Sequence, residues 1–264
     1  MSRLVMINSD NKDAPALPPA EGVDVVLQDL RVRAFARTPY DHLVVEIGHV
    51  DAAERALSEG CDAMLIDTFA DYAIERIRTV AGVPVIGAGE AGIAEAAQDG
   101  RRFSIVTVWP TSMGWLYDER LEHCAGGERC GGVHHVGAEE ELELLGTATG
   151  VQARMSRGEQ STLDTIVDAC HRAIEHDGSE AVLLGCTCMS PVADAIQARC
   201  DFPVIDASAA GLRAAYAALE RGDIPTPSAP TRRAGTIPGL VDAWLATGDL
   251  PAIDECDVCA ITPS

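Results

Sequence analysis

The chain has 264 residues, of which 47% are hydrophobic, and its formal net charge is −21. This length and apolar content suffice for one large domain or two small ones with buried cores. The negative charge argues against nucleic acid or an anionic membrane surface as a partner, because both would be repelled. Schiff-base chemistry is also disfavoured, since the single lysine, Lys12, lies in a polar segment.

No apolar run approaches the roughly 20 residues that a membrane helix needs. Residues 1–11 read as a first strand rather than as a signal peptide, so we expect a cytoplasmic protein. The nine cysteines are an odd number without a secretory signal. We therefore expect most of them to be reduced and buried as small apolar residues.

Short apolar runs alternate with helical stretches along the chain, which predicts parallel strands joined by crossover helices. The predicted strands include residues 4–7, 23–27, 63–66, 83–86, 104–108, 133–136, 181–184 and 202–205. The predicted helices include residues 51–59, 112–124, 139–146, 161–176 and a short one near 240–247.

Two segments of the chain resemble each other, one beginning at Gly60 and the other at Gly178. Each has an apolar strand, a polar turn, a helical stretch and a second apolar strand after a proline. The repeat predicts an α/β fold of two pseudo-symmetric, doubly wound, flavodoxin-like halves with a cleft between their parallel sheets. Because ligands bind beyond the carboxyl ends of such strands, we expect the turns after 63–66 and 181–184 to face each other.

We expect residues 1–100 plus about 204–222 to form the first half, and residues 101–203 the second. Residues 223–264 read as a C-terminal arm and tail, first rich in Pro, Thr and Arg and later acidic. A packing or interface arm is the favoured reading, and it hints at a homo-oligomer. The Cys256 and Cys259 pair in this tail lacks both the βαβ context of a redox motif and a second pair for zinc.

Two further patterns are better explained by packing than by ligands. Residues 87–92 match G-x-G-x-x-G, but no acidic residue follows the next strand to bind a ribose, so we favour strand-to-helix packing over a nucleotide. We also expect no metal site, because the spacing is wrong for one among His123, Cys124, Cys130, His134 and His135.

The turn after residues 181–184 carries the reactive candidate, Cys186. Pro191 suits the first turn of a helix, so Cys186 is predicted to lie just before a helix N-terminus. The helix dipole and free N–H groups there stabilise a thiolate, and the same groups hold a substrate carboxylate or enolate. A buried structural cysteine is the simpler alternative, but the repeat, which opposes this turn to its own copy, favours a site.

In the repeat, Thr68 occupies the position equivalent to Cys186. Thr68 and Asp71 fit a capping box, which needs no catalysis. The functional alternative is that the Thr68 hydroxyl and the following N–H groups bind the substrate, with Asp67 or Asp71 as a second acid/base group.

The segment LLGCTCMSP, the paired turns, and PVIGAGEAG followed by FSIVTVWPTSM resemble the aspartate/glutamate/hydantoin racemase superfamily, above all its hydantoin and allantoin racemase branch. The similarity runs to about residue 220. It implies a cofactor-independent isomerase that acts on a small carboxylate, amino-acid or hydantoin-like anion through an enolate-like intermediate. In this family two opposed cysteines exchange the proton; Cys186 matches the second, and the first falls on Thr68.

The same resemblance and the two turns suggest which residues bind the substrate: Asn8, Phe69, Glu90, Thr107, Gly185, Thr187 and Cys188. Trp109, Trp115 and Tyr117 either wall the pocket or pack in the core.

The missing thiol leaves several functions open, because a threonine hydroxyl is far too weak an acid for proton exchange at neutral pH. Asp67 or Asp71 can replace the lost base and preserve racemase or epimerase activity. Cys186 can act alone, as in the arylmalonate decarboxylase branch, or as a nucleophile, as in the maleate isomerase branch of cis–trans isomerases. A non-catalytic protein that binds an anionic metabolite is the remaining alternative.

Overall fold

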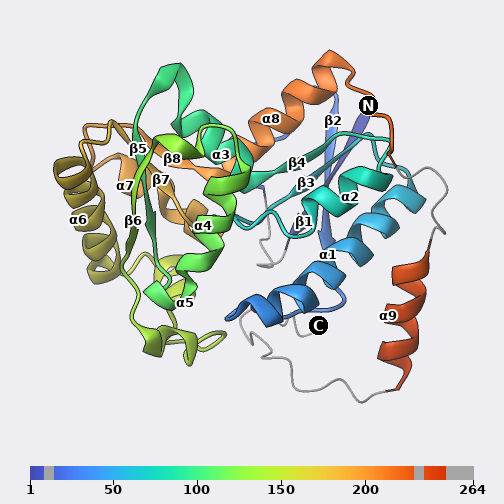
Figure 1. Ribbon diagram of the computed structural model, residues 1–264, viewed down its shortest axis with the longest axis horizontal. Helices are drawn as coiled ribbons and strands as arrows, with labels where there is room; N and C mark the ends of the chain where they lie inside the picture. Colours follow the sequence, from blue (N-terminus) through green and yellow to red (C-terminus); the bar gives the residue numbers. More distant parts are fainter. Residues whose placement is uncertain (9–14, 229–234, 248–264) are drawn as a thin grey trace.

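The computed structural model describes residues 1–8, 15–228 and 235–247, and within them it confirms an α/β fold with two similar halves (Figure 1). The first sheet has the parallel order β2-β1-β3-β4, formed by β1 (Ser2–Asn8), β2 (Val23–Asp29), β3 (Ala63–Ile66) and β4 (Val85–Gly87). The second repeats it as β6-β5-β7-β8, formed by β5 (Phe103–Thr107), β6 (Cys130–His135), β7 (Ala181–Leu184) and β8 (Val204–Asp206).

Helices connect these strands and cover both sheets. In the first half they are α1 (Pro39–Glu59) and α2 (Ile74–Val80), and α3 (Ala88–Ala96) leads from β4 to the second half, whose core includes its Ile93 and Ala96. In the second half they are α4 (Gly114–His123), α5 (Val151–Ser156), α6 (Gln160–Asp177) and α7 (Ala193–Gln197), with the 3-10 helix η5 (Thr187–Val192) before α7. The last two helices of the described residues are α8 (Ala207–Arg221) and α9 (Thr236–Ala246).

The central strands are buried on both faces, as their unbroken apolar sequences predict. In β1, Val5 and Ile7 pack into one cluster with α1 and α2, whereas Leu4 and Met6 pack into another with α8. A third cluster forms the core of the second half around β5 and β7. Each sheet is therefore held between two layers of helix, which leaves the carboxyl ends of its strands for the connecting turns.

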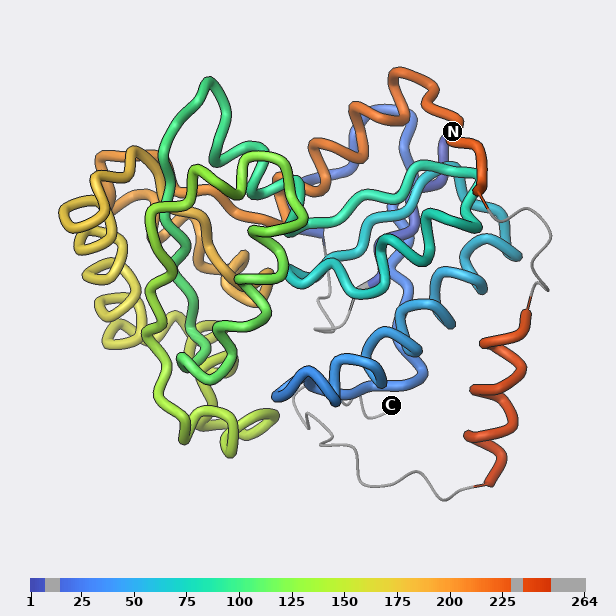
Figure 2. The backbone as a smooth tube through the Cα atoms, in the orientation of Figure 1, coloured from blue at the N-terminus to red at the C-terminus, as the bar shows by residue number. Residues whose placement is uncertain are grey.

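The return of the chain to the first half begins later than expected. We expected residues from about 204 to belong to the first half, but β8 pairs with β7 in the second sheet. The helix that follows, α8, crosses back to the first half (Figure 2). Its Leu212 and Ala215 pack against the first sheet. The crossover occurs at Asp206, whose carboxylate accepts a hydrogen bond from the Ser208 amide and so caps α8.

Two predicted helices differ in extent. The helix expected at 51–59 begins at Pro39, because Thr38 and Asp41 form a capping box and proline suits the first helical turn. The helix expected at 139–146 is only a 3-10 turn, Glu139–Leu142. Its three successive glutamates present no apolar stripe, and the next α-helix, α5, begins at Val151.

The C-terminal helix α9 packs against α1. The Arg31 guanidinium bonds to Asp51 of α1 and Asp242 of α9, and the Gly235 amide donates to the Glu54 carboxylate. The Cys256 and Cys259 pair lies outside the described residues. Within the described ranges, no helix combines the length and the apolar character needed to cross a bilayer.

Candidate functional site

The two repeated turns open onto one cavity of about 110 Å³ beyond the carboxyl ends of the strands. Thr68, Phe69 and Ala70 reach it from the turn after β3, and Gly185, Cys186 and Thr187 reach it from the turn after β7. The remaining walls come from the loop after β2, from α1, from the segment before α2, from the loop after β5 and α4, and from α5 and the loop before it: Arg33, Ala34, Phe35, Ala36, Val45, Tyr72, Trp109, Met113, Leu116, Tyr117, Leu145 and Gln152.

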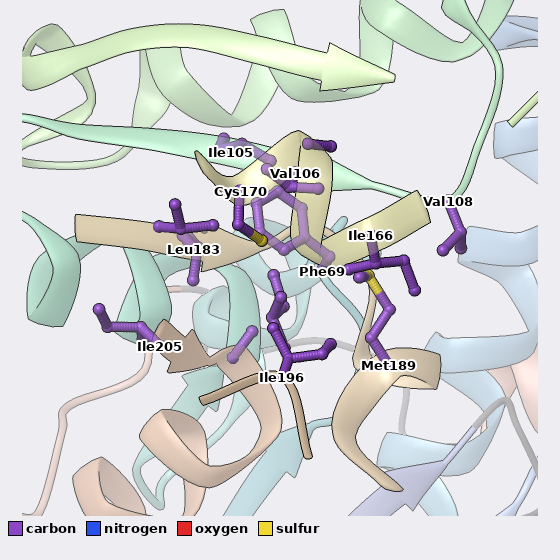
Figure 3. Packing of buried hydrophobic residues seen from close by; sticks show 14 of the residues in the cluster. Phe69, Ile105, Val106, Val108, Ile166, Cys170, Leu183, Met189, Ile196 and Ile205 are labelled. Atoms are coloured by element: carbon purple, nitrogen blue, oxygen red, sulfur yellow. The ribbon is translucent and has the colours of Figure 1, made fainter. Parts of the chain in front are cut away.

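Two contacts hold the turns face to face. The Thr187 hydroxyl donates to the backbone carbonyl of Asp67 at 3.1 Å, which joins the two halves directly. Phe69, 4% exposed, leaves the first half and inserts among Val106, Ile166 and Met189 in the core of the second (Figure 3). Because a buried phenyl ring and a buried hydrogen bond both fix this contact, the turns have little freedom to separate.

Cys186 ends β7 in extended backbone and is half-buried at the cavity wall. We expected a helix to start directly after it, with Pro191 in its first turn. Instead the six-residue η5 follows, Pro191 lies inside it, and α7 begins only at Ala193. The helix dipole behind the sulfur is correspondingly weak, and the Cys188 N–H donates to Cys186 Sγ at 3.1 Å.

Cys186 and Cys188 are joined by a disulfide, with their Cα atoms 5.1 Å apart. This corrects the expectation of reduced cysteines for this pair. The other described cysteines are free: Cys61, Cys124, Cys130, Cys170 and Cys200. The tight turn brings the two sulfurs together, and it also points the Cys188 amide back at Cys186 Sγ. Proton transfer by Cys186 requires the reduced form of this pair, since a disulfide carries no exchangeable proton.

Thr68 lies opposite on the cavity wall, 5% exposed, and its hydroxyl has no hydrogen-bond partner. The capping box predicted for Thr68 and Asp71 is wrong, because α2 begins only at Ile74 and Asp71 has a positive φ of 48°. A buried hydroxyl without a partner is costly and therefore uncommon. Its position at the cavity wall makes it a natural partner for a polar atom of a ligand.

Asp71 turns away from the cavity and caps α3. Its carboxylate accepts hydrogen bonds from the amides of Gly89 and Glu90 at 2.8 and 2.7 Å, and Arg120 of α4 lies 3.5 Å away. Burial and the nearby Glu90 carboxylate raise the pKa of Asp71 to about 7. A Cβ on Gly89 would lie 2.0 Å from the Phe69 carbonyl. This glycine of the G-x-G-x-x-G match therefore serves the packing of the turn on α3, where Asp71 occupies the amides.

The other residues expected at the site, where their side chains are described, do not line the cavity. Asp67 is fully buried and presents its backbone carbonyl to Thr187. Glu90 pairs with Arg78. Thr107 is fully buried against the Tyr117 hydroxyl at 2.5 Å. Two further residues remain: Cys188 is bonded to Cys186, and the side chain of Asn8 lies outside the described part of the chain.

Aromatic rings form much of the cavity wall, and the sequence signalled only some of them. Trp109 and Tyr117 line it, whereas Trp115 does not. The Tyr117 hydroxyl is fully engaged, bonding Thr107 and donating to the Gly185 carbonyl at 2.9 Å, and burial raises the pKa of its phenol. Phe35, 4.8 Å from Trp109 between ring centroids, comes from a loop that carries no motif.

A buried histidine stands behind the cavity wall. The ring of His49 lies 5.0 Å from that of Tyr72, its Nδ1 bonds the Val45 carbonyl, and its Nε2 has no partner. Complete burial lowers the pKa of His49 to about 4, so the ring is neutral at pH 7. In the part of the chain that the structure describes, no three His, Cys, Asp or Glu side chains are gathered as metal ligands would be.

Chemically, the cavity combines one cysteine, several hydroxyls and a single charged lining group, Arg33, among the described residues. No described carboxylate lines it. Twin strand-to-turn junctions thus close on one cavity with a cysteine at its wall, the arrangement that the resemblance to the racemase superfamily predicts. Residues 11–215 match the sequence model of the Asp/Glu/hydantoin racemase family, and the chain belongs to that family.

Individual relatives agree with this assignment. A hydantoin racemase of Pseudomonas sp. (strain NS671) is 29% identical over 183 residues, which cover 69% of this chain and 68% of the relative. A hydantoin racemase of Paenarthrobacter aurescens is 25% identical over 231 residues, covering 83% and 92% of the two chains. The solved allantoin racemase from Klebsiella pneumoniae shares the fold with a TM-score of 0.75 at 22% identity, covering 88% of this chain and 95% of its own.

Proposed function

We propose that the protein is a cofactor-independent racemase or epimerase that acts on a hydantoin-like or related small anion through the reduced thiol of Cys186. The proposal rests above all on the shared cavity, where Cys186 and Thr68 stand on opposed, repeated turns. Cys186 removes or delivers the proton at the acidic carbon, and an enolate-like intermediate forms between the turns. The Cys188 amide, 3.1 Å from the sulfur, stabilises the thiolate.

The cavity lining supports a hydantoin-like substrate over a free amino acid. An amino acid brings an ammonium group that needs an anionic partner, and no described carboxylate lines the cavity. A hydantoin ring brings amide and carbonyl groups, which suit the unpartnered Thr68 hydroxyl and the turn amides. The apolar walls around Phe35 and Trp109 suit the substituent on the acidic carbon.

A cofactor-free decarboxylase is the second candidate, and one observation favours it. Thr68 stands where an opposing thiol is expected, while Asp71 is committed to α3 and does not line the cavity. A single thiol suffices to protonate a carbanion that loss of CO₂ has already formed, whereas two-sided racemisation requires a second proton-exchanging group.

Isotope exchange tests the proposed function. The reduced protein is incubated in D₂O with single enantiomers of a panel of 5-substituted hydantoins and allantoin, and deuterium at the acidic carbon is followed by NMR. We expect exchange in the native protein and its loss in Cys186→Ala. Exchange that persists in Cys186→Ala refutes the role of the thiol.

Three further measurements separate the candidates. Release of CO₂ from a substituted malonate, without hydantoin exchange, establishes the decarboxylase. Thr68→Cys restores the opposed thiol, so a gain of racemisation in this variant identifies one-sided chemistry in the native protein. Stabilisation of the fold by such ligands without any turnover identifies a binding protein.

A further inference from the structure

We propose that Cys186 and Cys188 form a reversible disulfide that responds to hydroperoxides and determines whether a free thiol is present in the cavity. The proposal extends the proposed function, since it regulates the same thiol. Its effect on turnover depends on that function, but the chemical modification itself does not.

The turn after β7 has the geometry and the exposure that this reaction needs. One residue separates the two cysteines, and their Cα atoms lie 5.1 Å apart, within the range that a disulfide spans. Both side chains are only half-buried, and Cys186 lines the cavity, so a molecule as small as hydrogen peroxide has access to the sulfur. The Cys188 amide donates to Cys186 Sγ and thereby favours the thiolate that attacks a peroxide.

The other described cysteines are poorer targets. Burial is the main cause that raises the pKa of each of their thiols, and for Cys124 and Cys170 the pKa reaches about 12. A raised pKa leaves little thiolate at neutral pH, and the thiolate is the form that reacts. The thiols of Cys170 and Cys200 are hydrogen-bonded neighbours. This second pair therefore shows whether oxidation is selective for Cys186 and Cys188.

The chemistry balances without a further reactant. The Cys186 thiolate attacks one peroxide oxygen; the S–O bond forms, the O–O bond breaks, and hydroxide leaves. The sulfur, oxidised by two electrons, is now a sulfenic acid. Cys188 attacks that sulfur, the S–S bond forms, and the hydroxyl group leaves as water. The protons of the two thiols end in two molecules of water, and a dithiol reductant reverses the change by exchange.

The consequence follows from the role of the sulfur. In the disulfide neither cysteine carries an exchangeable proton, so the cavity keeps its shape but loses its acid/base group. Cys188 also protects Cys186, because a sulfenic acid without a neighbouring thiol proceeds to the irreversible sulfinic acid. Cys188 is therefore the resolving cysteine of the pair.

Peptide mapping tests the proposal on the full chain. Tryptic cleavage after Arg172 and Arg199 yields peptide 173–199, which contains Cys186 and Cys188 but neither Cys170 nor Cys200. The reduced protein is treated with hydrogen peroxide, and its remaining thiols are blocked with N-ethylmaleimide. We expect peptide 173–199 to carry no N-ethylmaleimide and to be lighter by two hydrogen atoms than the same peptide with two free thiols. Treatment with dithiothreitol before blocking should let both thiols react with N-ethylmaleimide again. A cross-link between Cys170 and Cys200 that forms first, or a peptide 173–199 that stays reduced, overturns the proposal.

The variant Cys188→Ser removes the resolving thiol, and Cys200→Ser is the matched control outside the pair. We expect peroxide to take Cys186 to the sulfinic acid in Cys188→Ser but to the disulfide in Cys200→Ser. Circular dichroism checks that both variants fold. If one variant does not fold, the mass test on the native protein decides the proposal by itself. Because the mass is measured without substrate, the two proposals fail separately. Absence of turnover in the reduced protein refutes the proposed function but does not refute the reversible disulfide.

Discussion

Replacing Thr68 by valine is expected to stabilise the folded protein while weakening its ligand site. The Thr68 hydroxyl is buried without a partner, whereas a hydroxyl in the unfolded chain is hydrogen-bonded to water. Valine has nearly the same shape and carries a methyl group in place of this hydroxyl. The substitution therefore removes a desolvation cost and adds buried apolar surface.

The size of the gain follows from these two terms. An unsatisfied buried hydroxyl costs about 1–3 kcal/mol, and a buried methyl group contributes roughly 0.8 kcal/mol. Because the unpartnered oxygen lies at a cavity wall that a small ligand or water can reach, we expect a net gain of about 1–2 kcal/mol in the free energy of unfolding. For a chain of this length each kcal/mol raises Tm by about 2–4 °C.

Thr187 provides the matched control, because it is also buried, at 2% exposed, but its hydroxyl donates to the Asp67 carbonyl. Thr187→Val removes this bond between the halves and is expected to cost about 1–2 kcal/mol. Urea unfolding of the reduced, ligand-free proteins measures both effects. If Thr68→Val destabilises the protein as much as Thr187→Val does, the Thr68 hydroxyl has a partner in the folded state and the reasoning fails.

Three further predictions concern residues around the cavity. The folded-state pKa of His49 is about 4, below its ordinary 6.5. The neutral buried ring therefore contributes fully to stability above pH 6.5. This contribution is lost as the pH falls, and at pH 4 the loss reaches about 3 kcal/mol. Thermal unfolding across this pH range should therefore show a flatter profile for His49→Gln than for the native protein. Asp71→Ala removes both caps on α3 and the partner of buried Arg120, so urea unfolding should show a loss of about 3 kcal/mol; a loss below 1 kcal/mol contradicts the capping role. Tyr117→Phe deletes the bond to the Gly185 carbonyl and should cost about 1–2 kcal/mol by the same measurement, and an unchanged midpoint would show that this bond contributes nothing.

Local sequence was sufficient for the fold and for the equivalence of the two turns. The runs Ala63–Ile66 and Ala181–Leu184 became central strands, because a parallel strand buried on both faces needs an unbroken apolar sequence. The repeat aligned Thr68 with Cys186 because each follows its strand at the same distance, and both line the cavity. These features depend on residues near each other in the chain, so their pattern is readable from the sequence.

The function of several polar residues depended instead on partners far away in the chain. Asp71 fitted a local capping box with Thr68, yet it caps α3 through Gly89, 18 residues on, because α3 begins against its turn. Glu90 and Thr107 were expected in the pocket, but Arg78 and Tyr117 engage them elsewhere. A carboxylate or hydroxyl takes the donor or acceptor that folding brings nearest, and spacing along the chain does not specify which one that is.

The sequence by itself determined the two α/β halves, the family and the pair of turns that face each other. Only the tertiary structure decided what surrounds the sulfur: a wall of rings that includes Phe35, a hydroxyl on Thr68 without a partner, and Cys188 bonded to Cys186. The physical reason is that strand patterns follow from local burial, whereas a cavity is formed by loops from separate parts of the chain. Their meeting is set by the packing of the two halves, which Phe69 and Thr187 join.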